Sequence, residues 1–268
     1  MHLQEPEWHR ARYLTNGLLS DDAWSNSFNG LLQQRIEIVV HKIQVDSLKE
    51  DLKLWLHVQS DNLLAGAILI ARYQYPDLDE QKVYEQLNKI KRDIWLEVNE
   101  NMTALEQVNV INHILFAREG FSGNTTNYHA PQNSFINSVL ETKKGNPLSL
   151  GIIYLLIAQQ LGLPVYGVNL PEHFVLAYVD KATEFSTDEK EVLFYVNAFS
   201  KGTVFGKSDV DDFIRKLNLE PKSEYYQPCS HADMILRMLR NVAASFQKLG
   251  DMDKVNELNG LIGLFGNS

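Results

Sequence analysis

The chain has little cysteine, a deficit of basic residues and no long apolar run. One cysteine among 268 residues excludes an internal disulfide and is typical of a reducing compartment. Lys and Arg number 25 against 34 Asp and Glu, a formal net charge of −9, which argues against a broad basic surface for nucleic acid. The longest apolar run, residues 147–158, is too short to span a bilayer, and the start MHLQEPEWHR has no apolar signal region. We therefore expect a cytoplasmic protein with neither a nucleic-acid nor a membrane partner.

Two common classes of ligand site also lack their signatures. The eight histidines are scattered, and no two of them form a ligand pair at helical spacing. The glycines form neither a phosphate-binding loop nor a dinucleotide fingerprint. We expect no metal and no cofactor.

Apolar periodicity predicts helices first, mixed structure in the middle and helices last. Helical spacing of apolar residues covers 31–59, 62–73, 78–99 and 104–117. Runs rich in Val, Phe, Tyr and Leu predict strands over 163–169, 174–180 and 193–198, with a polar loop at 181–190. Residues 234–249 and 252–265 predict one tetratricopeptide-like hairpin, which cannot bury its apolar face alone and is expected to pack on the core.

The middle of the chain carries the most informative segment, KGNPLSLGIIYLLIAQQLGLP from Lys144 to Pro164. Asn146 is a good helix N-cap, Pro147 suits the first helical position, and residues 149–160 have the apolar content of a buried helix. The turn at 170–172 then brings His173 to the start of a strand, and Asn197 lies on a later strand.

This order of elements resembles the transglutaminase-like superfamily. Its enzymes have a basic-x-Gly-x-Cys motif at the start of the helix and Gly-(Ile/Leu)-Pro about one helix later, which residues 143–147 and 162–164 match except at the cysteine. Residues 64–79 and 120–140 resemble the SirB-type family of bacterial transglutaminase-like proteins, and the similarity extends over roughly residues 60–200. A similar domain in an F-box protein implies a binding role in that protein.

The resemblance implies an α+β fold. We expect a papain/transglutaminase-like core with an antiparallel sheet and an N-terminal helix over residues 119–220. A helical region at 1–118 and the tetratricopeptide-like hairpin at 221–268 are expected to flank it.

The resemblance also implies a degenerate catalytic triad of Pro147, His173 and Asn197. A thiol nucleophile needs an acidified sulfur and an oxyanion site that usually includes its own backbone N–H, and Pro147 supplies neither. His173 and Asn197 are either a retained base and its orienting amide or structural residues. Ser149 follows Pro147 by two residues, about 200° around the helix, so we expect it to interact with the Asn146 cap rather than to replace the nucleophile. Cys229 lies far outside the matched core and is expected to be inert.

A polar segment at 121–134 separates two predicted helices and carries Asn124, Tyr128 and Asn133. These side chains either line a cleft with Asn146 and Ser149 as binding residues or tie an irregular loop to itself. Two functions therefore remain open. The favoured one is a non-catalytic module that binds a peptide or protein in the degenerate cleft. The alternative is a hydrolase, amidase- or protease-like, that uses His173 with a non-cysteine nucleophile.

Overall fold

The structure is a computed structural model that describes residues 21–184 and 190–267, with side chains described for 32–184 and 190–266. The segment MHLQEPEWHR and residues 185–189 of the predicted loop lie outside the described residues. Residues from Leu48 onward form one unit and the chain up to Ser47 another, and helix α2 (Asp21–Val58) contributes to both. The candidate site lies entirely in the larger unit.

Helices open the larger unit, as the apolar spacing predicts. α3 (Leu63–Gln74) begins at Asn62, whose side chain accepts a hydrogen bond from the N–H of Ala65, and α4 (Glu80–Trp95) begins at Asp79 in the same manner. α5 (Ala104–Asn112) begins with a reciprocal capping box between Thr103 and Glu106. The helix predicted to end near residue 117 changes at His113 into a π-helix, η1 (His113–Arg118), and short helices η2 (Pro131–Ser134) and α6 (Ile136–Thr142) follow.

An antiparallel sheet of four strands lies beside the central helix. The strands run in the order β3 (Val165–Val168), β4 (Val175–Val179), β5 (Val192–Asn197) and β6 (Thr203–Phe205). All three strands predicted from composition are present with slightly different bounds, and β6 is additional. A two-residue parallel pair, β1 (Ser122–Gly123) with β2 (Lys144–Gly145), joins the polar loop to the approach of the central helix. Together with the helices, this sheet confirms the predicted α+β class.

Helices cover both faces of the sheet. α7 (Pro147–Gln160) packs on β3 and β4, while Val210 and Ile214 of α8 (Lys207–Lys216) pack with Val175 and Ala177 of β4. Every residue of β4 is therefore buried, although a strand with one solvated face would alternate.

Phe174 fixes the start of β4 against the central helix. A methyl group at Gly151 of α7 would lie 2.7 Å from Phe174 Cε1, and one at Gly167 of β3 would lie 2.6 Å from Phe174 Cζ. These two glycines therefore leave the space that the Phe174 ring fills. Because His173 is the preceding residue, this packing also fixes where the histidine enters the site.

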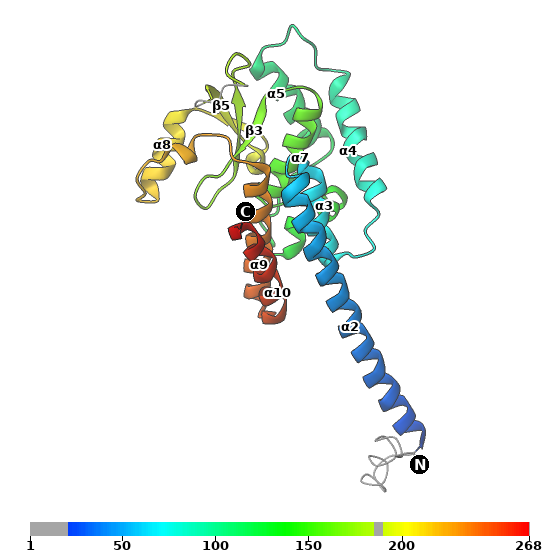
Figure 1. The fold of residues 1–268 in the computed structure, drawn as a ribbon. Helices are drawn as coiled ribbons and strands as arrows, with labels where there is room; N and C mark the ends of the chain where they lie inside the picture. Colours follow the sequence, from blue (N-terminus) through cyan, green and yellow to red (C-terminus); the bar gives the residue numbers. More distant parts are fainter. Residues whose placement is uncertain (1–20, 185–189, 268) are drawn as a thin grey trace. The chain divides into compact units, whose positions relative to one another are not determined.

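The C-terminal helices pack on the same unit. α9 (His231–Leu249) contacts α3, η2 and α7, and α10 (Met252–Ile262) lies beside it in Figure 1, where the pair runs from orange to red. Gly250 joins them with a φ of 78°, a left-handed conformation that favours glycine. Among the described residues, no helix is both long enough and apolar enough to cross a membrane.

Candidate functional site

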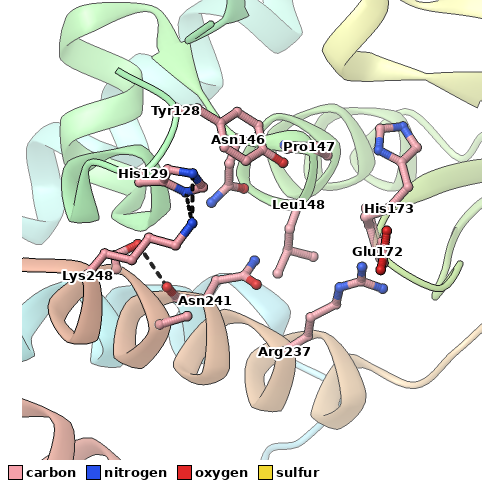
Figure 2. A pocket seen from close by; sticks show the side chains of 13 residues that line it. Tyr128, His129, Asn146, Pro147, Leu148, Glu172, His173, Arg237, Asn241 and Lys248 are labelled. Atoms are coloured by element: carbon pink, nitrogen blue, oxygen red, sulfur yellow. Dashed lines mark hydrogen bonds between the residues drawn. The ribbon is translucent and has the colours of Figure 1, made fainter. Parts of the chain in front are cut away.

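A cavity of about 710 Å³ opens at the start of α7. Four segments supply its walls: the polar loop at 128–129, the start of α7, the turn before β4, and one face of α9 (Figure 2). The lining residues are Tyr128, His129, Asn146, Pro147, Leu148, Glu172, His173, Phe174, Arg237, Asn241, Ala244, Ser245 and Lys248. Of the residues singled out from the sequence, Tyr128, Asn146, Pro147 and His173 therefore share one cavity. Asn124, Asn133, Ser149, Asn197 and Cys229 are not among its lining residues.

The start of α7 is a closed hydrogen-bond network. Asn146 Oδ1 accepts a 2.9 Å bond from the N–H of Ser149, and Ser149 Oγ accepts a 3.0 Å bond from the N–H of Asn146, which makes a capping box. Asn146 Nδ2 donates to Ser134 Oγ at 2.9 Å, and Ser149 Oγ donates to the carbonyl of Asn133 at 2.6 Å. All four residues are buried. Ser149 thus makes the cap contact expected from its position.

The polar loop is tied to itself next to this network. Asn124 Nδ2 donates to Asn133 Oδ1 at 2.9 Å, and Asn133 Nδ2 donates to the carbonyls of Asn127 and Tyr128. The side chain of Tyr128 remains exposed, and its ring meets Phe199 edge to face with the centroids 6.0 Å apart. Asn124 and Asn133 therefore hold the loop in place, and Tyr128 is the member of this group that lines the cavity.

The turn before β4 positions His173. The N–H of His173 donates to the carbonyl of Leu170, with Pro171 and Glu172 as the central residues, and Glu172 has a φ of 58°. A positive φ at this position is typical of a type II turn, where glycine or asparagine is usual, so Glu172 holds a strained conformation. The turn places His173 in the wall of the cavity that Pro147 also lines (Figure 2).

His173 has the properties of a neutral, partly buried imidazole. Burial lowers its pKa below the ordinary value, the hydrogen-bonding side chain of Asn197 raises it, and the charge of Arg237 lowers it further. Nε2 is buried and has no hydrogen-bond partner among the described residues. Asn197 Oδ1 accepts a 3.2 Å bond from the N–H of Ser200, so this oxygen also holds its own turn. The ring is therefore influenced by Asn197 while Nε2 remains unpaired.

The cavity presents no thiol. Pro147 occupies the first position of α7, where it offers neither a side-chain nucleophile nor a backbone N–H. Cys229 lies outside the lining, and burial raises the pKa of its thiol to about 12. Within the described part of the chain, no three His, Cys, Asp or Glu residues gather closely enough to hold a metal ion.

One face of α9 supplies cavity residues that the sequence analysis does not identify. Arg237, Asn241 and Lys248 point from this helix into the cavity in Figure 2, and Ser245 of the same helix also lines it. Arg237 Nη1 donates to the carbonyl of Leu170 at 2.8 Å and to Asn169 Oδ1 at 3.2 Å, which ties α9 to the strand end before the His173 turn. The spacing of 237, 241, 245 and 248 places all four on one helix face, a pattern visible in the sequence but without meaning until α9 is placed.

Comparison with known proteins indicates the same superfamily as the order of the elements. A family model of the transglutaminase-like superfamily matches residues 81–240, more than half of the chain. The chain is 29% identical over 199 residues to a UPF0162 protein of Xylella fastidiosa (strain 9a5c), covering 72% of this chain and 67% of that protein. It is 24% identical over 195 residues to UPF0162 protein YchA of Escherichia coli (strain K12), covering 71% and 69%.

A third relative is a much longer protein. The chain is 26% identical over 188 residues to human F-box only protein 21, covering 61% of this chain and 30% of that protein. The match thus spans less than a third of the F-box relative's length. No solved structure matches the chain. Because the family model and the arrangement of helix, histidine strand and amide strand agree, the chain belongs to the transglutaminase-like superfamily.

Proposed function

We propose that the protein is a non-catalytic member of its superfamily that binds a peptide or a protein segment in the cavity at the start of α7. The observation that carries this proposal is Pro147, which lines the cavity at the position where the superfamily motif has its cysteine. Acyl transfer through a thiol requires the sulfur and usually the N–H of the same residue. Proline removes both groups, so recognition without thiol chemistry is the function that this site supports best.

The volume and the lining of the cavity are suited to a short peptide segment. Its volume of about 710 Å³ falls within the usual range for ligand pockets, roughly 300–1,000 Å³. The lining combines the apolar side chains of Leu148 and Phe174 with the polar groups of Asn241 and Ser245. A peptide offers apolar side chains and amide groups together, and it matches such a lining.

A hydrolase is the second candidate because His173 Nε2 is unpaired and its pKa is lowered by burial. A neutral imidazole can act as a general base on a water molecule, and this reaction would require the buried Nε2 to become accessible to water. This reaction would need neither Pro147 nor Cys229. It would need His173.

Affinity selection with a soluble library of random octapeptides tests the proposal. The full-length protein is immobilised, retained peptides are identified by mass spectrometry, and Ala244→Trp fills the cavity from the exposed face of α9. Ala182→Trp, on an exposed turn outside the cavity lining, is the matched control. We expect the wild type and the control to retain the same peptides and Ala244→Trp to lose them. Retention by all three proteins, or by none, would contradict the proposal.

The same spectra separate the two candidate functions. Binding without chemistry leaves retained peptides at their original mass. Cleaved or deamidated peptides that disappear with His173→Ala would favour the hydrolase. His231→Ala, at the start of α9 and outside the cavity lining, controls for loss of a histidine.

Finer features of the family assignment belong to this proposal as well. We propose that the protein is of the SirB type, that α9 and α10 are a tetratricopeptide-like hairpin, and that the protein is cytoplasmic. The resemblance of residues 64–79 and 120–140 to that family supports the first of these, and the helix pair around Gly250 supports the second. The single cysteine in the sequence supports the third.

A further inference from the structure

Arg237 is a partly buried cation whose described contacts include no negative charge. Both of its hydrogen bonds use Nη1 and go to neutral oxygens, those of Leu170 and Asn169. Within residues 21–184 and 190–267, no carboxylate forms an ion pair with it, and Nη2 and Nε make no hydrogen bond. Burial also lowers the pKa of the guanidinium. A desolvated charge without a counter-ion is costly, so this side of the cavity is suited to a ligand that brings an anion.

The other charges of the cavity favour the same sign of ligand. Lys248 is exposed, and its Nζ lies 2.8 Å from Nε2 and 3.1 Å from Nδ1 of the His129 ring. Glu172 is the one carboxylate in the lining, and it is exposed at the turn. Two cations therefore face the cavity against one anion. Figure 2 shows Arg237 and Lys248 at separate points along α9, with Leu148 and Asn241 between them.

The number of free donors indicates a carboxylate rather than a phosphate. Pro147 has no N–H, and the N–H of Ser149 is already bonded to Asn146 Oδ1. Among the N–H groups of this first turn, that of Leu148 has no acceptor within the described residues, because the first turn of a helix has no preceding turn to supply one. The free edge of one guanidinium matches two coplanar oxygens, whereas phosphate sites usually gather several backbone N–H groups or several cations.

We propose that Arg237, beside the first turn of α7, binds a carboxylate group of the peptide ligand. This inference rests on the proposed peptide-binding function and specifies its ligand. The carboxylate belongs either to the peptide's C-terminus or to an Asp or Glu side chain. His173 and Asn241 flank the same position and contact the adjoining part of the peptide.

The test uses an octapeptide retained in the affinity selection described above, synthesised in three forms. One form has a free C-terminus, one has a C-terminal amide, and one has each Asp or Glu changed to Asn or Gln. Dissociation constants of all three are measured by isothermal titration calorimetry with the unaltered protein. Loss of a charge-assisted hydrogen bond of roughly 1.5–3 kcal/mol corresponds to about a tenfold or greater loss of affinity in the form that lacks the bound carboxylate. The form that loses affinity identifies the source.

Two protein variants then assign the carboxylate to Arg237. Arg237→Gln should abolish the difference between the forms, while Arg240→Gln, which changes an exposed arginine on the same helix, should preserve it. Glu172→Gln removes the opposing charge and should tighten binding of the carboxylate form by about two- to threefold, the scale of an exposed charge pair. Unchanged melting temperatures and circular dichroism identify the variants that are folded, and the comparison of peptide forms requires no variant at all.

Each outcome decides the inference separately from the proposed function. If peptides are retained but all three forms bind equally well, the carboxylate proposal is wrong and peptide binding stands. The same holds if Arg237→Gln preserves the difference between the forms. If no peptide is retained in the first place, the proposed function fails.

Discussion

The two sides of the cavity differ in how completely their polar groups are paired. At the start of α7, buried Asn133, Ser134, Asn146 and Ser149 form hydrogen bonds with one another and with backbone groups. On α9, Arg237 leaves two of its nitrogens unpaired among the described residues. Paired polar groups hold the architecture, since each would be costly to leave unsatisfied, whereas unpaired ones retain capacity for a ligand. Closeness to the cavity therefore does not by itself make a residue functional.

Replacing a residue of the hydrogen-bonded network at the start of α7 should have the largest effect on stability. Asn146→Ala removes the cap of α7 and leaves the N–H of Ser149 and Ser134 Oγ without the Asn146 contacts. The free energy of unfolding should fall by about 3 kcal/mol, the sum of a lost cap and one buried unsatisfied group. Urea denaturation followed by circular dichroism measures this change. Asn259→Ala, on an exposed position of α10, is the control, and an equally small change in both variants would break the comparison.

Replacing Arg237, on the α9 side of the cavity, should have a smaller effect on stability. Arg237→Met gives up the hydrogen bonds to Leu170 and Asn169 but also removes a desolvated charge. Because these effects oppose each other, the free energy of unfolding should change by less than about 1 kcal/mol. The same denaturation experiment measures it. A loss as large as that of Asn146→Ala would mean that Arg237 is mainly an anchor for the His173 turn.

His173 lies between the two sides and should make stability depend on pH. Burial lowers its pKa in the folded protein, so the unfolded chain takes up a proton first as the pH falls below the ordinary value of 6.5. The contribution of His173 is thus complete at neutral pH and declines on acidification through that value. The stability difference between the wild type and His173→Gln should shift against the wild type over this interval. A difference that is flat from pH 7.5 to about pH 5 would contradict the lowered pKa.

Cys229 should have the smallest effect on the cavity. With its thiol pKa raised to about 12, little thiolate exists near neutral pH, so iodoacetamide should label the native protein slowly and the urea-unfolded protein quickly. Cys229→Ser should leave peptide affinity unchanged because Cys229 is not among the lining residues. Rapid labelling of the native protein, measured by mass spectrometry, would overturn this description.

Local chemistry in the sequence predicts the start of α7 well. Asn146, Pro147 and Ser149 together specify the start of α7, and the structure has the helix with a capping box at that position. The strand at 174–180 and the helices at 62–73 and 78–99 are also present, since long periodic runs and good caps act locally. The order of helix, histidine and amide then indicates the superfamily.

The α9 side of the cavity could not be predicted from the sequence in the same way. The apolar stripe of α9 predicts that this helix is buried on one face. It does not predict that Arg237 and Lys248, on another face, line the same cavity as the start of α7, about ninety residues earlier in the chain. β6 and α6 are missed because three or seven residues carry too little periodicity to be recognised. The role of Asn133 is likewise set by a contact with the Ser149 hydroxyl that no spacing rule encodes.

The central claim is that the cavity at Pro147 recognises a ligand without covalent chemistry. The most direct test is to incubate the wild type and His173→Ala with a fluorophosphonate and a vinyl sulfone and to locate adducts by peptide mass spectrometry. We predict no stoichiometric adduct on any cavity residue of the wild type, because Pro147 offers no nucleophile and burial keeps the Cys229 thiol protonated. A stoichiometric adduct on a cavity residue that disappears in His173→Ala would contradict the account and establish a catalytic nucleophile.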